Sequence, residues 1–212
     1  MHVPDGFLSP AITVPAWAAA VPLWAVAARR HFGARAADAL PVMGTLTAVA
    51  FVLQTLRIPV PGGTSTHVVG AALLALLFHP LAAFVCEGLV LAVQALFFGA
   101  GGVTTLAVNG LAMGLLGPGA AWLAFRAARR LRVADGPAAF VAAWLATQVA
   151  SLSVALALAL QHALDPSVFP VAPAVVLGAT MLPSLALTGV VEGAYTVAAL
   201  ALLRKARLDA RA

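Results

Sequence analysis

Long apolar runs alternate along the chain with short segments that are polar or rich in glycine and proline. Such runs are typical of transmembrane helices, which need about 20 apolar residues to cross a bilayer. The third run is short, and Pro183 predicts a kink or a break in the seventh. The pattern predicts seven spans, over about residues 10–28, 39–56, 68–78, 81–98, 106–125, 138–162 and 175–203.

The composition agrees with this pattern. Hydrophobic residues make up 63% of the chain and charged residues 9%, whereas a soluble domain has about 25% charged residues. Such a chain cannot cover a water-facing surface, so we predict an all-α polytopic membrane protein, multi-pass in the cell (inner) membrane. No polar stretch is long enough for a soluble domain. We expect one membrane domain over 1–212, with an N-terminal segment (1–9), a helical bundle (10–204) and a basic tail (204–212).

The basic residues predict the orientation of the chain in the membrane. With the N-terminus outside, seven spans place the loops 29–38 and 126–137 and the C-terminal tail in the cytoplasm. These segments hold eleven of the twelve Lys and Arg residues, and only Arg57 falls outside. The positive-inside rule therefore favours the N-terminus outside and the C-terminus cytoplasmic, whereas six spans with a re-entrant third would put the tail on the other side. Because the basic residues lie in short loops, the high pI does not indicate nucleic-acid binding.

The N-terminal segment 1–9 is a candidate metal site. The α-amine of Met1, the backbone amide of His2 and its imidazole can close fused chelate rings around one ion. Pro4 has no N–H, so successive amides cannot continue around the metal, and one position is left for another ligand. The predicted topology puts the linker 57–67 outside, on the same side of the membrane as the N-terminus. We therefore expect His67 to supply the fourth nitrogen, a set that favours Ni(II) or Cu(II) first and Co(II) next.

Each of these residues also has a simpler interpretation. A histidine at position 2 is often accidental, and one that begins a helix after a glycine-rich turn is more often a cap. The linker before His67 holds two prolines and two glycines, so we expect it to be irregular, and such backbone survives at membrane depth only when buried or lining a cavity. Glu87 and Glu192 lie within spans, where ionisable residues are functional candidates. We favour the interpretation that they join helices or hold loop backbone.

Three separate motifs then resemble the cobalt/nickel substrate-capture subunits of energy-coupling-factor transporters, the CbiM/NikM family. They are the start Met-His-Val-Pro-Asp-Gly-Phe-Leu-Ser-Pro, the segment Ile58-Pro-Val-Pro-Gly-Gly-Thr-Ser-Thr-His67, and Gln94-Ala-Leu-Phe-Phe-Gly-Ala-Gly-Gly-Val-Thr-Thr-Leu-Ala-Val-Asn109.

The resemblance implies a seven-helix subunit whose N-terminus inserts into the bundle. It implies that the metal is held by the amine of Met1, the amide and imidazole of His2, and the imidazole of His67, with Ser65 and Asn109 close by. The form of the His67 segment looks closer to the nickel members, because cobalt members more often carry a Cys shortly before this His and none is present here.

The resemblance also implies a function and its partners. The chain would capture Ni2+ or Co2+ as transported substrate, with nickel favoured, within an ECF-type ABC importer. Its partners would be a membrane coupling (T) subunit, two cytoplasmic ATPase subunits and a small accessory membrane subunit. The sequence has no Walker motif, so ATP hydrolysis is expected from the partners and the chain itself is not predicted to be an enzyme.

Two other functions compete with metal uptake. A capture subunit for an organic vitamin would need aromatic and polar groups around its cavity, yet aromatic residues make up only 7% of the chain. An intramembrane hydrolase would need a nucleophile beside a base, or a metal motif such as HExxH, which the sequence lacks. Extending the N-terminus by one residue should abolish capture of a metal and hardly affect the other two functions.

Overall fold

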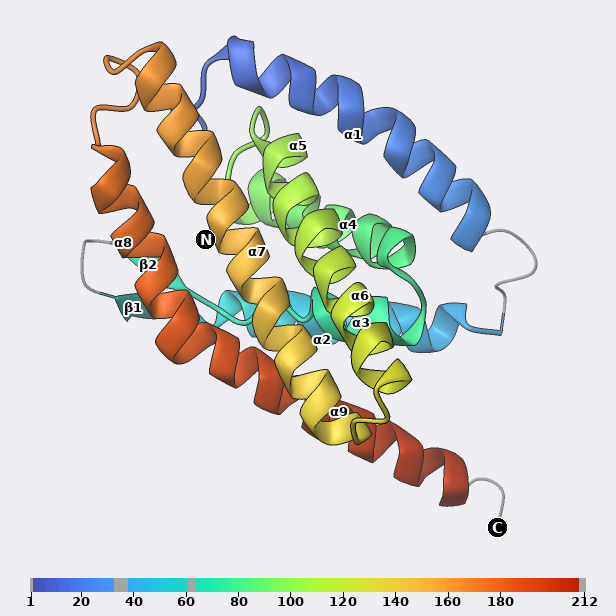
Figure 1. Ribbon diagram of the computed structural model, residues 1–212. Helices are drawn as coiled ribbons and strands as arrows, with labels where there is room; N and C mark the ends of the chain where they lie inside the picture. The colour runs from blue at the N-terminus through green and yellow to red at the C-terminus, as the bar shows by residue number, and fades with distance from the viewer. Residues whose placement is uncertain (1, 33–37, 61–63, 210–212) are drawn as a thin grey trace.

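The computed structural model describes residues 2–32, 38–60 and 64–209, and it is all-helical apart from one small β-ribbon. Figure 1 shows the helices packed side by side, with α7 between α6 and the α8–α9 rod and with α1 along one outer edge. The elements are α1 (Pro10–His31), α2 (Leu40–Thr55), β1 (Ile58–Val60), β2 (Thr64–Thr66), α3 (Ala71–Leu77), α4 (Pro80–Phe98), α5 (Leu106–Asn109), η2 (Gly110–Leu116), α6 (Gly117–Arg130), α7 (Asp135–Leu164), α8 (Pro173–Pro183), η3 (Ser184–Thr188) and α9 (Gly189–Asp209).

Seven helical segments match the seven predicted runs, because α5, η2 and α6 form one rod and α8, η3 and α9 form another. Five segments in the described part of the chain are long and apolar enough to cross a membrane. The third segment is short, as its run of apolar residues predicts. Its helix α3 has seven residues, which rise about 10 Å against a hydrocarbon core of about 30 Å. Residues 67–70 are not helical, so the helix begins later than the predicted bound of about residue 68.

The linker before α3 is more regular than predicted. Strands β1 and β2 pair as an antiparallel ribbon, with Ile58 opposite Thr66 and Val60 opposite Thr64. The expectation of an irregular linker is wrong for these residues, because their backbone groups satisfy one another across the two strands. Beyond β2 the chain runs without regular structure through residues 67–70, all of them buried. This is the non-helical backbone that an apolar environment tolerates only inside protein.

Pro183 does not end the seventh helix. The rod continues from α8 through the π-helical segment η3 into α9. Proline lacks an N–H and its ring crowds the preceding turn, so one widened turn follows where a regular helix would be strained. The carbonyl of Pro183 instead accepts a hydrogen bond from the hydroxyl of Thr188 at 3.1 Å.

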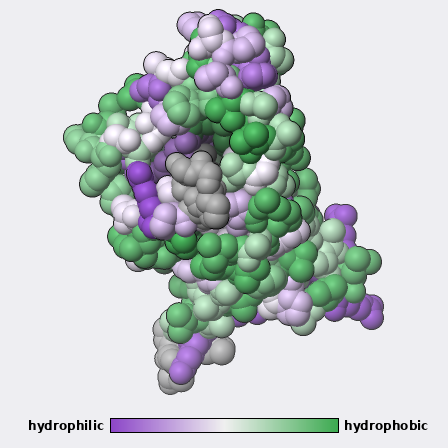
Figure 2. Space-filling view, turned by 90° about the vertical axis from the view of Figure 1, so that its left-hand side faces the viewer, coloured by the Kyte–Doolittle hydropathy of each residue, from purple (hydrophilic) through white to green (hydrophobic). Residues whose placement is uncertain are grey.

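Small residues fill the helix interfaces and larger apolar residues face outward. On α7, the buried positions include Ala138, Ala142 and Ala146, and a Cβ added to Gly117 of α6 would lie 2.8 Å from the carbonyl oxygen of Ala146. Helices in lipid pack through close backbone approach of this kind, because burial of apolar surface gives little driving force for their association there. Figure 2 shows the complementary outer surface, much of which is hydrophobic.

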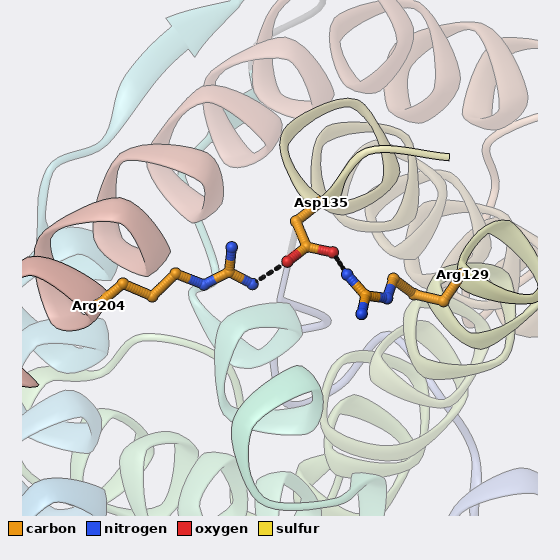
Figure 3. Close-up of polar contacts among 3 residues, drawn as sticks. All are labelled: Arg129, Asp135 and Arg204. Carbon is orange, nitrogen blue, oxygen red and sulfur yellow. Dashed lines mark hydrogen bonds and ion pairs between the residues drawn. The ribbon is translucent and has the colours of Figure 1, made fainter. Parts of the chain in front are cut away.

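One end of the bundle is joined by a charge cluster (Figure 3). Asp135, the first residue of α7, forms ion pairs with Arg129 of α6 and Arg204 of α9. A carboxylate in the first turn of α7 also complements the helix dipole. The cluster therefore connects the three helices α6, α7 and α9.

Candidate metal-binding site

The N-terminal segment packs into the bundle through Val3 and Leu8, which are buried, whereas residues 4–7 are exposed. The side chain of Val3 is 1% exposed. Its N–H donates to Oδ1 of Asn109 at 2.9 Å, and its carbonyl accepts from Nδ2 of Asn109 at 3.0 Å and from the hydroxyl of Thr105 at 2.6 Å. Asn109 thus satisfies both backbone polar groups of Val3, the residue that follows His2.

Asp5 provides a second anchor. Its carboxylate accepts the N–H groups of Val103 at 3.0 Å and Thr104 at 2.8 Å, and also the hydroxyl of Thr104. These hydrogen bonds, with that of the Thr104 hydroxyl largest, hold the pKa of Asp5 below its ordinary value. Further along, the N–H of Ser9 donates to Oε1 of Gln161 on α7 at 2.7 Å. Segment 2–9 is therefore tied to two helices that are more than 90 residues away in sequence.

Gly101 makes room for this segment. Its φ is +82°, a backbone conformation that favours glycine. An added Cβ would lie 3.2 Å from Cβ of His2 and 3.4 Å from Nδ2 of Asn109. The glycine-rich turn between α4 and α5 consequently forms one wall of the site.

His67 reaches the same place from the β-ribbon. It is 2% exposed, and its Nδ1 lies 3.2 Å from the carbonyl oxygen of Val68. A proton on Nδ1 makes this contact a hydrogen bond and puts the imidazole lone pair on Nε2, the arrangement found in histidines that bind metals.

The structure brings the two imidazoles together. The ring centroids of His2 and His67 are 4.7 Å apart, with 59° between the ring planes. Nε2 of His2 is buried and has no hydrogen-bond partner among the described residues, which is unusual for a buried polar atom and is compatible with a metal ligand. The prediction that these two histidines share one site is therefore consistent with the geometry.

The environment keeps both rings neutral. Burial lowers the pKa of His2 well below its ordinary value, and it lowers the pKa of His67 to about 3. A neutral imidazole is the form that binds a metal ion.

Side chains alone do not complete a metal site here. No group of three or more His, Cys, Asp and Glu residues that could hold an ion occurs in the described part of the chain. Two imidazoles are present, so a set of four nitrogens needs donors other than His, Cys, Asp and Glu side chains. Met1, whose amine the sequence predicts as a ligand, lies outside the described residues.

Asn109 and Ser65 are the two residues expected close to the ligands. Asn109 contacts Val3, the residue that follows His2. Ser65 is part-buried on β2 opposite Pro59, and no hydrogen bond joins its side chain to either imidazole among the described residues. Glu87 and Glu192 act as predicted: Glu87 accepts from Gln54 of α2 at 2.9 Å, and Glu192 accepts from backbone that follows His67.

Other polar residues that support the site are not evident from the sequence. Gln54 donates to the carbonyl of Val69 at 2.9 Å, and Thr66 bonds to Thr188 at 3.2 Å. A polar residue within an apolar run was the available signal for Gln54, as it was for Glu87. Thr105 and Thr188 gave no such signal, because threonine is common in membrane helices.

Comparison with known proteins agrees with these observations. A family model described as cobalt uptake substrate-specific transmembrane region matches residues 2–210. The chain belongs to this family, CbiM. The resemblance drawn from the three sequence motifs is thereby confirmed. CbiM proteins are transport proteins and not enzymes, and this chain is a multi-pass membrane protein of that family.

Named relatives include both nickel and cobalt proteins. The fused nickel transport protein NikMN of Rhodobacter capsulatus is 33% identical over 169 residues, which are 80% of this chain and 49% of that protein. The cobalt transport protein CbiM of Geobacter sulfurreducens is 34% identical over 212 residues, 99% of this chain and 61% of that protein. The chain thus spans about half to three fifths of the length of these two relatives.

A solved structure shares the whole fold. A crystal structure described as a transition metal transporter superposes with a TM-score of 0.91 at 32% identity, covering 97% of this chain and 93% of that one.

Proposed function

We propose that this chain is the substrate-capture subunit of an ECF-type importer and that it binds Ni2+ or Co2+ for uptake. The observation that supports this best is the pair of imidazoles, that of His67 buried and that of His2 half-buried, whose ring centroids are 4.7 Å apart. The family description, cobalt uptake, and the nickel and cobalt relatives agree with such a substrate.

The proposed ligands are four nitrogens. The α-amine of Met1, the amide and imidazole of His2, and the imidazole of His67 would surround the ion in a plane. An ionised amide and a planar set favour Ni(II) over ions that prefer a tetrahedron. The Cys-free segment before His67 points the same way, so we favour nickel as the substrate.

Asn109 and Ser65 would position the segments that carry the two histidines. Asn109 would fix the backbone of Val3 and so set the direction in which His2 projects. Ser65, two residues before His67, would shape the ribbon that carries this histidine.

The remaining features of the importer follow from the family. We propose that residues 1–212 form one membrane domain, with the N-terminus outside and the C-terminus cytoplasmic. A membrane coupling subunit and two cytoplasmic ATPases would drive release of the ion inside. The fused nickel relative suggests an accessory subunit as a further partner.

Metal binding to the purified protein tests this proposal. Isothermal titration with Ni2+ and Co2+ should give one site per chain, provided that mass spectrometry shows Met1 intact. One residue added before Met1 should abolish binding, because it converts the amine into an amide. His2→Ala and His67→Ala should each weaken binding by at least about 10-fold. Removing a metal ligand lowers affinity more than removing a residue that orients a ligand.

His162→Ala is the matched control, since that ring contacts the carbonyl of Phe169 and not the site. Its affinity should equal that of the wild type. Equal binding by the extended protein, or by a variant with both site histidines replaced, would contradict the proposal.

A further inference from the structure

The last helix holds the chain on both sides of His67. Thr66 precedes this histidine, and its hydroxyl bonds to the hydroxyl of Thr188 at 3.2 Å. After the histidine, the N–H of Val69 donates to Glu192 at 2.7 Å and the N–H of Gly70 donates to the same carboxylate at 2.8 Å. Thr188 and Glu192 are four residues apart, which puts them on one face of a helix.

Glu192 is a buried carboxylate that binds backbone N–H groups. It is 2% exposed, and each of its oxygens accepts one of the two backbone N–H groups. These groups have no helical or strand partner, because residues 67–70 lie between β2 and α3. A carboxylate with two acceptor oxygens is the side chain that can satisfy both at once.

The other side of this segment is held by α2. Gln54 donates to the carbonyl of Val69 at 2.9 Å and to both oxygens of Glu87 of α4, at 2.9 and 3.0 Å. Val69 is therefore fixed through its N–H by α9 and through its carbonyl by α2. The His67 segment has no freedom to shift without breaking bonds to one of these helices.

The π-helical turn contributes to the geometry. Pro183 precedes η3, and the hydroxyl of Thr188 donates to the Pro183 carbonyl. The widened turn changes the direction in which the side chains after it point. Thr188 is fully buried and faces Thr66. Pro183, where the sequence predicts a kink or a break, thus precedes the π-helical turn from which Thr188 meets Thr66.

We propose that Glu192, with Thr188, is a positioning residue that sets the direction of the His67 imidazole and so links metal affinity to the position of α9. The proposal rests on the function proposed above, since it concerns the same metal site. The link gives a route for release: a displacement of α9 relative to α2 would turn His67 away from the ion while the N-terminal donors stayed in place.

Glu192→Gln is the test. The amide keeps the size of the side chain but offers one acceptor oxygen, and its NH2 faces a second N–H. We expect affinity for Ni2+ to fall by about 10- to 100-fold, the range found when groups that orient metal ligands are removed. With Cu2+ as probe, the visible d–d band should move to longer wavelength, toward that of His67→Ala, because a nitrogen donor is weakened.

Two further variants keep the result interpretable. Thr188→Val removes a single neutral hydrogen-bonding group and should shift affinity and band in the same direction, by less. Thr196→Val is the matched control, because Thr196 is fully buried on α9 and its hydroxyl has no hydrogen-bond partner among the described residues. It should leave both readouts at the wild-type value.

The outcomes separate the two proposals. A wild-type protein that binds no metal would overturn both. If the wild type binds and His67→Ala changes its spectrum, but folded Glu192→Gln and Thr188→Val match the wild type in affinity and band, the positioning role alone is wrong. If Glu192 had only a structural role, Glu192→Gln would lower the unfolding temperature without moving the d–d band. That result would also overturn the positioning role.

Discussion

At the scale of single residues, the molecule uses polar side chains to replace backbone partners that helices would otherwise supply. Asn109 pairs with both polar groups of Val3, and Glu192 and Gln54 together satisfy the backbone from Val69 to Gly70. A buried backbone group without a partner costs about 1–3 kcal/mol. Non-helical chain can therefore sit within the bundle only where these side chains meet it.

Asp5 gives a pH-dependent test at this scale. Its pKa in the folded protein lies below the ordinary value, mainly through the hydroxyl of Thr104. The anchoring contribution is therefore fully present above the ordinary pKa of about 3.9 and is lost as pH falls through the lower, folded value. We predict that the difference in unfolding temperature between wild type and Asp5→Asn is constant from about pH 8 to pH 5 and shrinks below about pH 4.

Asp165 is the control for Asp5. It too has a lowered pKa, mainly through the hydroxyl of Ser167, but its partners lie in its own loop. Asp165→Asn should leave metal affinity at the wild-type value at neutral pH, whereas Asp5→Asn should weaken it. Equal affinities for the two variants would show that the Asp5 anchor does not support the site.

At the scale of elements, short irregular segments between regular helices build the site. The β-ribbon carries His67, the turn between α4 and α5 receives the N-terminal segment, and η3 orients α9. Each segment departs from a continuous helix at a proline or glycine. The helices contribute rigidity, while these interruptions decide which side chains meet.

Gly101→Ala tests the turn between α4 and α5. Its positive φ and the 3.2 Å approach to Cβ of His2 both disfavour a side chain. We expect a loss of about 1 kcal/mol from the backbone conformation, together with weaker metal binding because His2 must move. Thermal unfolding and nickel titration measure the two effects.

Two other glycines separate these causes. Gly99 also has positive φ, but an added Cβ would meet nothing within 4 Å, so Gly99→Ala should lower stability and leave affinity unchanged. Gly136 has neither constraint, and its replacement by Ala should be neutral or slightly stabilising. If Gly99→Ala weakened metal binding as much as Gly101→Ala, contact with His2 would not be the cause.

At the scale of the whole molecule, two charged side chains join the last helix to separate parts of the fold. Glu192 ties α9 to the His67 segment, and Arg204, twelve residues later, ties it to Asp135 of α7. Twelve residues of helix correspond to about 18 Å. The site and the charge cluster therefore lie at separate levels of one rod.

Asp135→Asn should separate stability from binding. Both arginine side chains are more than half exposed, so we expect a loss of at most about 1 kcal/mol. The loss should shrink at high salt, because exposed ion pairs are screened. Nickel affinity should stay at the wild-type value, since the cluster touches no site residue. A tenfold loss of affinity would show that the charge cluster also positions α9 at the site.

The sequence by itself determined the membrane class, the seven apolar segments, the family and the two histidines. These follow from hydropathy and from motifs that are local in the chain, so no knowledge of packing is needed to recognise them. The lengths of the helices and the positions of their interruptions are harder to predict from the sequence. The shortened α3 and the continuous helix through Pro183 depend on which neighbours satisfy the backbone, and that is not a local property.

Only the tertiary structure decided how the site is supported. Val3 meets Asn109 across 106 residues, and Val69 meets Glu192 across 123. Hydropathy marks such polar residues as unusual but does not say which backbone groups they reach. The partners are selected when the helices pack, because every unpaired group in an apolar interior must then find one.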